Sequence, residues 1–255
     1  MLICPICKKE LSKKDNSYIC LNNHTFDISK KGYVNFLSNH PNSGDNKDMV
    51  NARFDFLNNG YYLPLKEEIT KIIASFNPNT VLDLGCGVGY YTNELKTNVY
   101  GIDISKDAIA KASQYKDNHY FVSQANNLPF TDNSFDVILS IFSPIFSNEL
   151  YRVSKDNGII IIVTPKSHHL IELKELLYDN PYLNSDKKVS IEGFKLINEI
   201  ELRYQKDIPY LDIINLLKMT PYFYKTSKSD LDKLSTNLLI TMHFNIAIYK
   251  KSRDD

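Results

Sequence analysis

The stretch Val81-Leu-Asp-Leu-Gly-Cys-Gly-Val-Gly89 places three glycines at alternating positions directly after an apolar segment. The apolar residues are typical of a buried strand, and segment 91–96 beyond the glycines is compatible with a helix. Glycine in such a turn permits positive φ and lets a ligand approach the backbone closely. The dinucleotide fingerprint G-x-G-x-x-G is excluded because Tyr90 stands three residues after Gly87, and the Gly-Lys-Ser/Thr ending of a Walker loop is also missing.

Strand and helix alternate on both sides of this glycine loop. Two helices are expected within 49–76, joined near Gly60, and Ser105 is placed to cap a later helix. Strands are expected at 80–84, 99–103, 120–122, 135–140, 159–163, 200–204 and 238–249, with helices at 106–112, 149–153 and 170–178 and a tight turn at Asn157-Gly158. Strands buried on both faces predict a doubly wound α/β sheet, whose ligand lies at the carboxyl ends of the strands.

One acidic residue and one cysteine stand at positions of interest in this region. Asp103 ends the second expected strand, twenty residues after Asp83. A carboxylate at this place can accept hydrogen bonds from both hydroxyls of an unphosphorylated ribose. Cys86 lies inside the glycine loop, where a need for a small side chain explains it better than a nucleophilic role.

The N-terminal segment carries a candidate metal site. Cys4-x-x-Cys7 and Cys20-x-x-x-His24 supply three thiolates and an imidazole in two pairs separated by twelve residues. This set favours a tetrahedral Zn²⁺, and because all four positions are filled the ion is structural, one per chain. Metal binding can supply about 10 kcal/mol of folding free energy, which a segment so poor in apolar residues needs. The alternative, free thiols in a small turn, is disfavoured by the clustering and the spacing.

Composition and charge limit the remaining possibilities. The 255 residues include 30 Lys and Arg against 30 Asp and Glu, so bulk electrostatic binding of nucleic acid is not indicated. The longest apolar runs are strand-sized, no membrane span is expected, and the N-terminus lacks an export signal, which predicts a cytoplasmic protein. Turn-forming residues at 38–47 predict a linker. We therefore expect domains at 1–37 and 49–255, joined by a linker at 38–48.

The glycine loop, Asp103 and the stretch Leu128-Pro-Phe-Thr-Asp-Asn-Ser-Phe-Asp136 together resemble those of Rossmann-type S-adenosylmethionine (SAM) methyltransferases. The resemblance implies that Gly85, Gly87 and Val88 line the methionine and adenosine side of a SAM site, with Asp103 on the ribose. Either Gln124 or Asn126 can accept a hydrogen bond from the adenine amine. Asp136 is expected to be a structural carboxylate at a strand end.

Further motifs run nearly from end to end of the chain. They include Cys4-Pro-x-Cys7, Asn16-Ser-Tyr-Ile-Cys20, His24-x-Phe-Asp27, Gly32-Tyr-Val-Asn35, Arg53-x-x-Phe-Leu57, Gly60-x-Tyr62-x-Pro64-Leu65, Gly89-Tyr-Tyr-Thr92, His169-Leu-x-Glu-Leu-Lys174, Glu192-Gly-Phe194, Met219-Thr-Pro221 and Phe244-Asn-Ile246. Together these motifs resemble one family, the bacterial RlmA 23S rRNA (guanine-N1)-methyltransferases, including the macrolide-resistance type. The resemblance implies a Rossmann-like class I SAM-dependent methyltransferase sheet with a small N-terminal zinc-binding, RNA-recognition domain. It also implies methylation of N1 of a specific guanine in a 23S rRNA hairpin, a homodimer, and cofactor contacts from Tyr62 and His169.

Two other functions stay open at this point, and no general base is assigned. The segment 128–136 alone also suits a SAM methyltransferase for a small molecule. A separate alternative is a zinc-dependent RNA-binding protein whose methyltransferase fold is inactive, which the intact Gly85, Gly87, Gly89 and Asp103 disfavour. Phe142 or Phe146 could stack on guanine, although core packing is the expected role for each. The lysines of the zinc segment, with Tyr18, Phe26 and Tyr33, form either a small RNA-binding surface or an ordinary solvated face. These lysines are Lys8, Lys9, Lys13, Lys14, Lys30 and Lys31.

Overall fold

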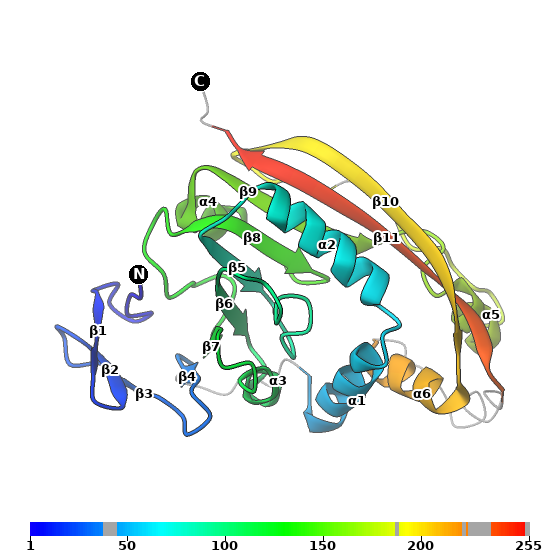
Figure 1. The fold of residues 1–255 in the computed structure, drawn as a ribbon, viewed down its shortest axis with the longest axis horizontal. Coiled ribbons are helices and arrows are strands. Elements are labelled where there is room, and N and C mark those ends of the chain that lie inside the picture. The colour runs from blue at the N-terminus through cyan, green and yellow to red at the C-terminus, as the bar shows by residue number, and fades with distance from the viewer. Residues whose placement is uncertain (38–44, 187–188, 221–222, 224–235, 253–255) are drawn as a thin grey trace.

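The computed structural model describes residues 1–37, 45–186, 189–220, 223 and 236–252. Its largest element is an eight-stranded sheet of order β10-β11-β9-β8-β5-β6-β7-β4 (Figure 1). Strands β4 to β9 pair in parallel, and β11 and β10 are added antiparallel at one side. The strands are β4 (Val34–Asn35), β5 (Thr80–Leu84), β6 (Asn98–Asp103), β7 (His119–Val122), β8 (Phe135–Ile141), β9 (Ser154–Pro165), β10 (Phe194–Ile208) and β11 (Leu238–Lys251). The expected doubly wound α/β sheet is therefore confirmed.

Helices cover the sheet, and α2 crosses the face of β5 and β8 (Figure 1). Ser105 caps α3 as predicted, since its side chain accepts a hydrogen bond from the N–H of Ala108. The pair of helices expected before the first central strand is present as α1 and α2, while α6, which packs beside α1, was not expected. The helices are α1 (Lys47–Asn58), α2 (Leu63–Ser75), α3 (Lys106–Ala112), α4 (Ser147–Val153), α5 (Ile171–Leu177) and α6 (Tyr210–Lys218).

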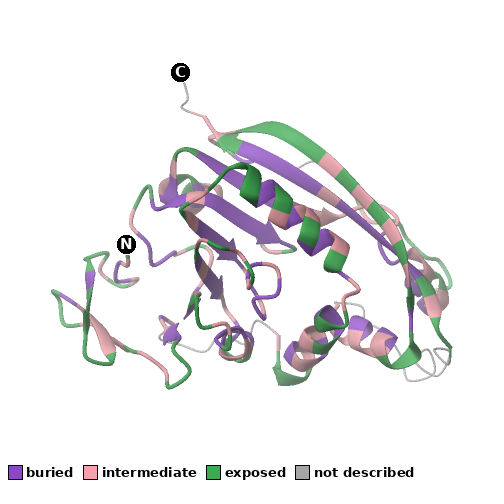
Figure 2. Ribbon diagram, viewed as in Figure 1, coloured by how far each residue is buried: buried purple, intermediate pink, exposed green. Residues whose placement is uncertain are grey.

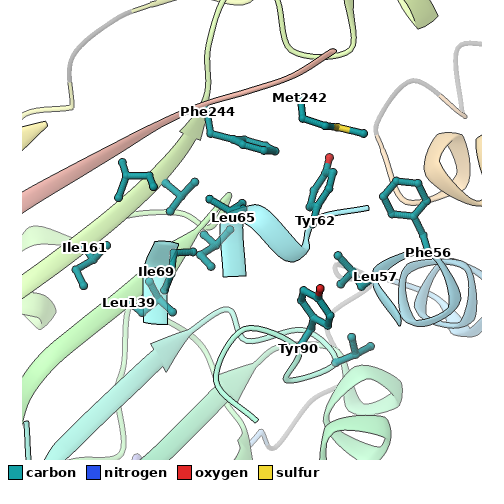
Figure 3. Packing of buried hydrophobic residues seen from close by; sticks show 14 of the residues in the cluster. Phe56, Leu57, Tyr62, Leu65, Ile69, Tyr90, Leu139, Ile161, Met242 and Phe244 are labelled. Carbon is teal, nitrogen blue, oxygen red and sulfur yellow. The ribbon is translucent and has the colours of Figure 1, made fainter. Parts of the chain in front are cut away.

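Two apolar cores lie on opposite faces of the sheet, because neighbouring residues of a strand point to opposite sides. Val81 belongs to the core under α1, α2 and α6, whereas Leu82 belongs to the other core. In the first core Tyr62 packs edge-on against Phe56 and Phe244, with ring centroids 5.4 and 5.2 Å away (Figure 3). The buried central strands contrast with β10, whose residues are mostly exposed at the edge (Figure 2). The core therefore anchors Tyr62 at the start of α2.

Two local expectations are wrong. Segment 91–96 forms turns and no helix, because other elements bind its side chains. Thr92 donates a 2.7 Å hydrogen bond to the Asp83 carboxylate. Lys66 Nζ donates hydrogen bonds of 2.8 Å to the side chains of Asn93 and Glu94. Asn157-Gly158 is not a turn between elements, since it lies within β9, where the register against β8 shifts. These side-chain contacts come from distant elements, so local propensity does not reveal them.

The N-terminal segment forms a small sheet of β1 (Leu11–Lys14), β2 (Ser17–Cys20) and β3 (Thr25–Asp27). It then contributes β4 to the large sheet, where Val34 pairs with Phe121 of β7. A bridge between Leu2 and Phe130 docks the other end of the segment. Residues 38–44 of the expected linker lie outside the described residues, and α1 already begins at Lys47. The domain boundaries expected at 37 and 49 therefore stay a prediction.

Candidate functional site

The four predicted metal ligands converge, and their ligand atoms all lie within 4.8 Å of one another. Cys7 Sγ is 3.6 Å from Cys20 Sγ, and His24 Nδ1 is 3.4 Å from Cys4 Sγ and 3.5 Å from Cys20 Sγ. Ligands at zinc–sulfur and zinc–nitrogen bond lengths of about 2.3 and 2.1 Å around a tetrahedron lie roughly 3.5–3.8 Å apart. The four side chains therefore fit one zinc ion, with no ligand position open for chemistry.

Each ligand pair sits on a tight knuckle of the backbone. The Cys4 carbonyl accepts a 2.8 Å hydrogen bond from the N–H of Lys8, and the Cys20 carbonyl accepts one of 2.9 Å from Asn23. Lys8 and Asn23 both have positive φ, at 60° and 61°. The short spacings within the two pairs therefore bend the chain so that two ligands of each pair face the same point.

A cleft of about 490 Å³ opens at the carboxyl ends of β5, β6 and β7, where the predicted ligand site lies. Gly85, Gly87 and Asp103 line this cleft, while Val88 and Tyr62 line a smaller adjoining pocket that shares both glycines. At Gly85, with φ +73°, an added Cβ would lie 2.3 Å from Ser143 Oγ. Only glycine therefore leaves the floor of the cleft open at this point.

The Asp103 carboxylate is oriented by the loop around it. Its oxygens accept hydrogen bonds from the N–H groups of Gly87 at 3.0 Å and Ser105 at 2.7 Å. Burial raises the pKa of Asp103, while these two N–H groups act in the opposite direction. A carboxylate offers about four acceptor positions, so Asp103 can still accept hydrogen bonds from hydroxyl groups in the cleft.

Tyr62 and His169 meet although 107 residues separate them. The Tyr62 hydroxyl lies 3.3 Å from His169 Nε2, and the His243 N–H donates to His169 Nδ1 at 3.3 Å. The His169 ring stacks on Phe142 at a centroid distance of 6.3 Å, but His169 lines neither pocket. Burial, with the nearby Lys174, lowers the pKa of His169 to about 3. His169 is therefore a neutral residue behind Tyr62, which lines the smaller pocket next to the cleft.

Phe142 and Phe146 are not core residues, contrary to expectation. They are 43% and 39% exposed, and both line the cleft together with Pro144. Phe142 has φ 54°, a strained value for a bulky residue, and its N–H donates a 3.1 Å hydrogen bond to the Val163 carbonyl of β9. The two aromatic rings therefore face the open part of the cleft.

The remaining residues singled out from the sequence have separate roles. Burial raises the pKa of the Cys86 thiol well above its usual value, so this cysteine is a packing residue. Asp136 accepts hydrogen bonds from Thr80 N at 2.9 Å and Lys155 Nζ at 2.9 Å, which makes it the expected structural carboxylate. Gln124 and Asn126, the two candidate adenine acceptors, both line the cleft.

Sequence reasoning assigned no role to an ion pair at the cleft. Arg53 on α1 donates to Asp45 at 2.8 Å, and both residues line the cleft. Asp45 fell in the expected linker, and Arg53 was noted only as part of a motif. No spacing in the sequence links either residue to the glycine loop, because α1 reaches the cleft only through the folding of the whole sheet.

Fold and site together define a SAM-dependent methyltransferase that carries a zinc ribbon. The model of a methyltransferase domain matches residues 76–224, and the RlmA N-terminal model matches residues 2–42. The chain belongs to the RlmA family of 23S rRNA (guanine-N1)-methyltransferases. Among the described residues, no helix is both long and apolar enough to cross a membrane.

Three curated relatives show how far the similarity extends. The putative 23S rRNA (guanine-N(1)-)-methyltransferase YxjB of Bacillus subtilis (strain 168) is 36% identical, covering 89% of this chain and 88% of that protein. The 23S rRNA (guanine(748)-N(1))-methyltransferase of Streptomyces fradiae is 31% identical, covering 69% of this chain and 67% of that protein. A putative 23S rRNA (guanine-N(1)-)-methyltransferase of Micromonospora griseorubida is 26% identical, covering 98% of this chain and 97% of that protein.

Proposed function

We propose that this protein transfers the methyl group of SAM to N1 of one guanine in a hairpin of 23S rRNA. One observation carries the proposal: the zinc-binding turn at residues 4–8 contacts the residue next to the cofactor cleft. Asn127, next to the cleft residue Asn126, donates to the Pro5 carbonyl at 3.2 Å and accepts a hydrogen bond from Lys8 Nζ. A methyltransferase for a small molecule has no need of a lysine-bearing metal module at this place, so the arrangement favours an RNA substrate.

The residues of the cleft have proposed roles toward the cofactor. Gly85, Gly87 and Val88 allow close approach of the methionine and adenosine, and Asp103 accepts the ribose hydroxyls. Tyr62 borders the pocket beside the glycine loop, and His169 positions its hydroxyl. When bound, SAM supplies an electrophilic methyl group, so the protein's main task is to align the acceptor and exclude water.

The target guanine requires a place outside its helix. N1 lies on the Watson–Crick edge and carries a proton, so the base must be unpaired before methylation and the proton must leave. Phe142 and Phe146 offer exposed aromatic surfaces in the cleft on which an unpaired base can stack. We further propose that the protein works in the cytoplasm, where its rRNA substrate is present, and as a homodimer, as the family resemblance implies.

Methylation with labelled SAM tests this function. The purified protein is incubated with large-subunit rRNA that lacks the modification, and the methylated position is mapped by arrest of reverse transcription, since a methyl group on N1 blocks base pairing. We expect one arrest site, at a hairpin guanine. Label found only in small metabolites would show that the substrate is a small molecule. Binding of RNA without binding of SAM would show that the methyltransferase fold is inactive.

A further inference from the structure

A second cleft, of about 320 Å³, lies between the zinc-bearing segment and the catalytic domain. Three lysines line it: Lys13 on β1, Lys31 before β4, and Lys116 before β7. All three are exposed, and within the part of the chain that the structure describes no aspartate or glutamate lines this cleft. A concave surface that gathers three positive charges without a counter-charge attracts an anion. The net charge of zero for the whole chain conceals this local excess.

The two parts of the molecule converge at this cleft. Lys116 Nζ donates to the Lys31 carbonyl at 3.2 Å, so the catalytic side reaches the zinc-bearing side directly. Lys13 is the strand partner of Tyr18 across β1 and β2, which places both residues at the same level of the small sheet. Because Val34 pairs with Phe121, the same β4–β7 contact that joins the two sheets also forms the wall of the cleft. The lysines are therefore held together by tertiary structure, although they are far apart in sequence.

Aromatic side chains lie beside the charges. His119 is exposed and stacks on Tyr100 with ring centroids 4.9 Å apart and planes 29° from parallel. Partial burial lowers the pKa of His119, so its ring is neutral at physiological pH and offers a flat surface and no charge. Tyr18 lines the same cleft. Lysines with adjacent flat rings match the two parts of a nucleotide, its phosphate and its base.

We propose that this cleft binds the backbone of the rRNA substrate, with a phosphate held by Lys13, Lys31 and Lys116 and a neighbouring base against His119 or Tyr18. The inference rests on the proposed rRNA substrate and adds a contact site outside the cofactor cleft. β7 runs from His119 toward the cofactor cleft over about 10 Å, three steps of roughly 3.3 Å. A strand of a few nucleotides covers that length, so one hairpin can reach both places.

Salt-dependent RNA binding tests the site. The triple variant K13A/K31A/K116A is compared with K71A/K96A/K195A, which removes three exposed lysines that line neither cleft. The probe is a 23S rRNA fragment that lacks the modification. Each lost phosphate contact lowers the slope of log K against log salt by about 0.7–0.9, so we expect a decrease of about that size for the cleft variant, which loses one phosphate contact. The RNA affinity of the cleft variant should fall about tenfold or more, whereas the RNA affinity of the control variant should change little.

Two further measurements separate this site from the catalytic machinery. For the cleft variant, the KM for RNA should rise while kcat at saturating RNA and the Kd for SAM stay at wild-type values. The variant H119A should weaken RNA binding without changing the salt slope, because stacking releases no counterions. Equal losses in the cleft and control triple variants would overturn the site, as would an unchanged slope. If the wild type binds the fragment but never methylates it, the proposed function fails while the binding site stands.

Discussion

The Tyr62 hydroxyl lies 3.3 Å from Nε2 of His169, and the direction of this hydrogen bond follows from the other ring nitrogen. The backbone N–H of His243 donates to His169 Nδ1, so Nδ1 carries no proton and Nε2 carries one. His169 therefore donates to Tyr62. It cannot at the same time accept the proton that leaves guanine N1, which removes it from the candidates for a general base.

Stability should depend on pH through His169. Its folded pKa of about 3 lies below the ordinary value of 6.5, so the unfolded chain takes up a proton below pH 6.5 that the folded chain does not. This contribution to the free energy of unfolding is complete above pH 6.5 and is lost as the pH falls toward 3. Its slope approaches about 1.4 kcal/mol per pH unit. Urea unfolding at several pH values should show a shallower pH dependence of the free energy of unfolding for His169→Asn than for the wild type, and an unchanged dependence would contradict this prediction.

Replacement of Gly85 by alanine should block the cofactor cleft. The added Cβ would meet Ser143 Oγ at 2.3 Å, on a backbone with φ +73°. Gly60→Ala is the matched control, because Gly60 has φ +80° and nothing within 4 Å of an added Cβ. Backbone strain of about 1–2 kcal/mol should lower the thermal stability of both variants. Calorimetric titration should show lost SAM affinity for Gly85→Ala alone, and equal affinities would contradict the assignment.

Asp103→Asn should weaken SAM binding. The carboxylate accepts from the N–H groups of Gly87 and Ser105, and an amide would place its own donor against one of them. Loss of hydrogen bonds to a charged group costs about 1.5–3 kcal/mol, or a roughly tenfold to hundredfold rise in Kd. Burial raises the pKa of Asp103. As the pH is lowered, the affinity of the wild type for SAM should therefore begin to fall at a higher pH than the ordinary pKa of an aspartate would give. Asp136→Asn, remote from the cleft, should leave the Kd for SAM unchanged.

Cys20→Ser should abolish zinc binding and destabilise the N-terminal segment. The remaining three ligands leave the tetrahedron incomplete, and the segment then lacks the folding free energy that the metal supplies. Metal analysis should find one zinc per chain in the wild type and in Cys86→Ala, and almost none in Cys20→Ser. Proteolysis should cut the variant first within residues 1–37. A full zinc complement in Cys20→Ser would show that the ligand set is wrong.

The sequence predicted most strands and helices of the central sheet, because each depends on a local alternation of apolar and polar residues. The zinc ligands were predictable for a similar reason, since each pair lies within one short turn. The helix expected at 91–96 does not form, because Asp83 and Lys66, which lie on other elements, hydrogen-bond to side chains of this segment. The prediction that Phe142 and Phe146 belong to the core was wrong. No local sequence pattern shows that the loop after β8 directs both rings into an open cleft.

The amino-acid sequence by itself determined the class of fold, the glycine loop and the four metal ligands. Tertiary structure alone decided which residues share a site. It brought His169 to Tyr62 and Lys116 to Lys31, residues whose separation along the chain carries no spacing signal. The physical reason is that short-range patterns reflect the geometry of a turn, a helix or a strand, whereas contacts between distant residues arise only when the sheet and its two apolar cores set the position of every element.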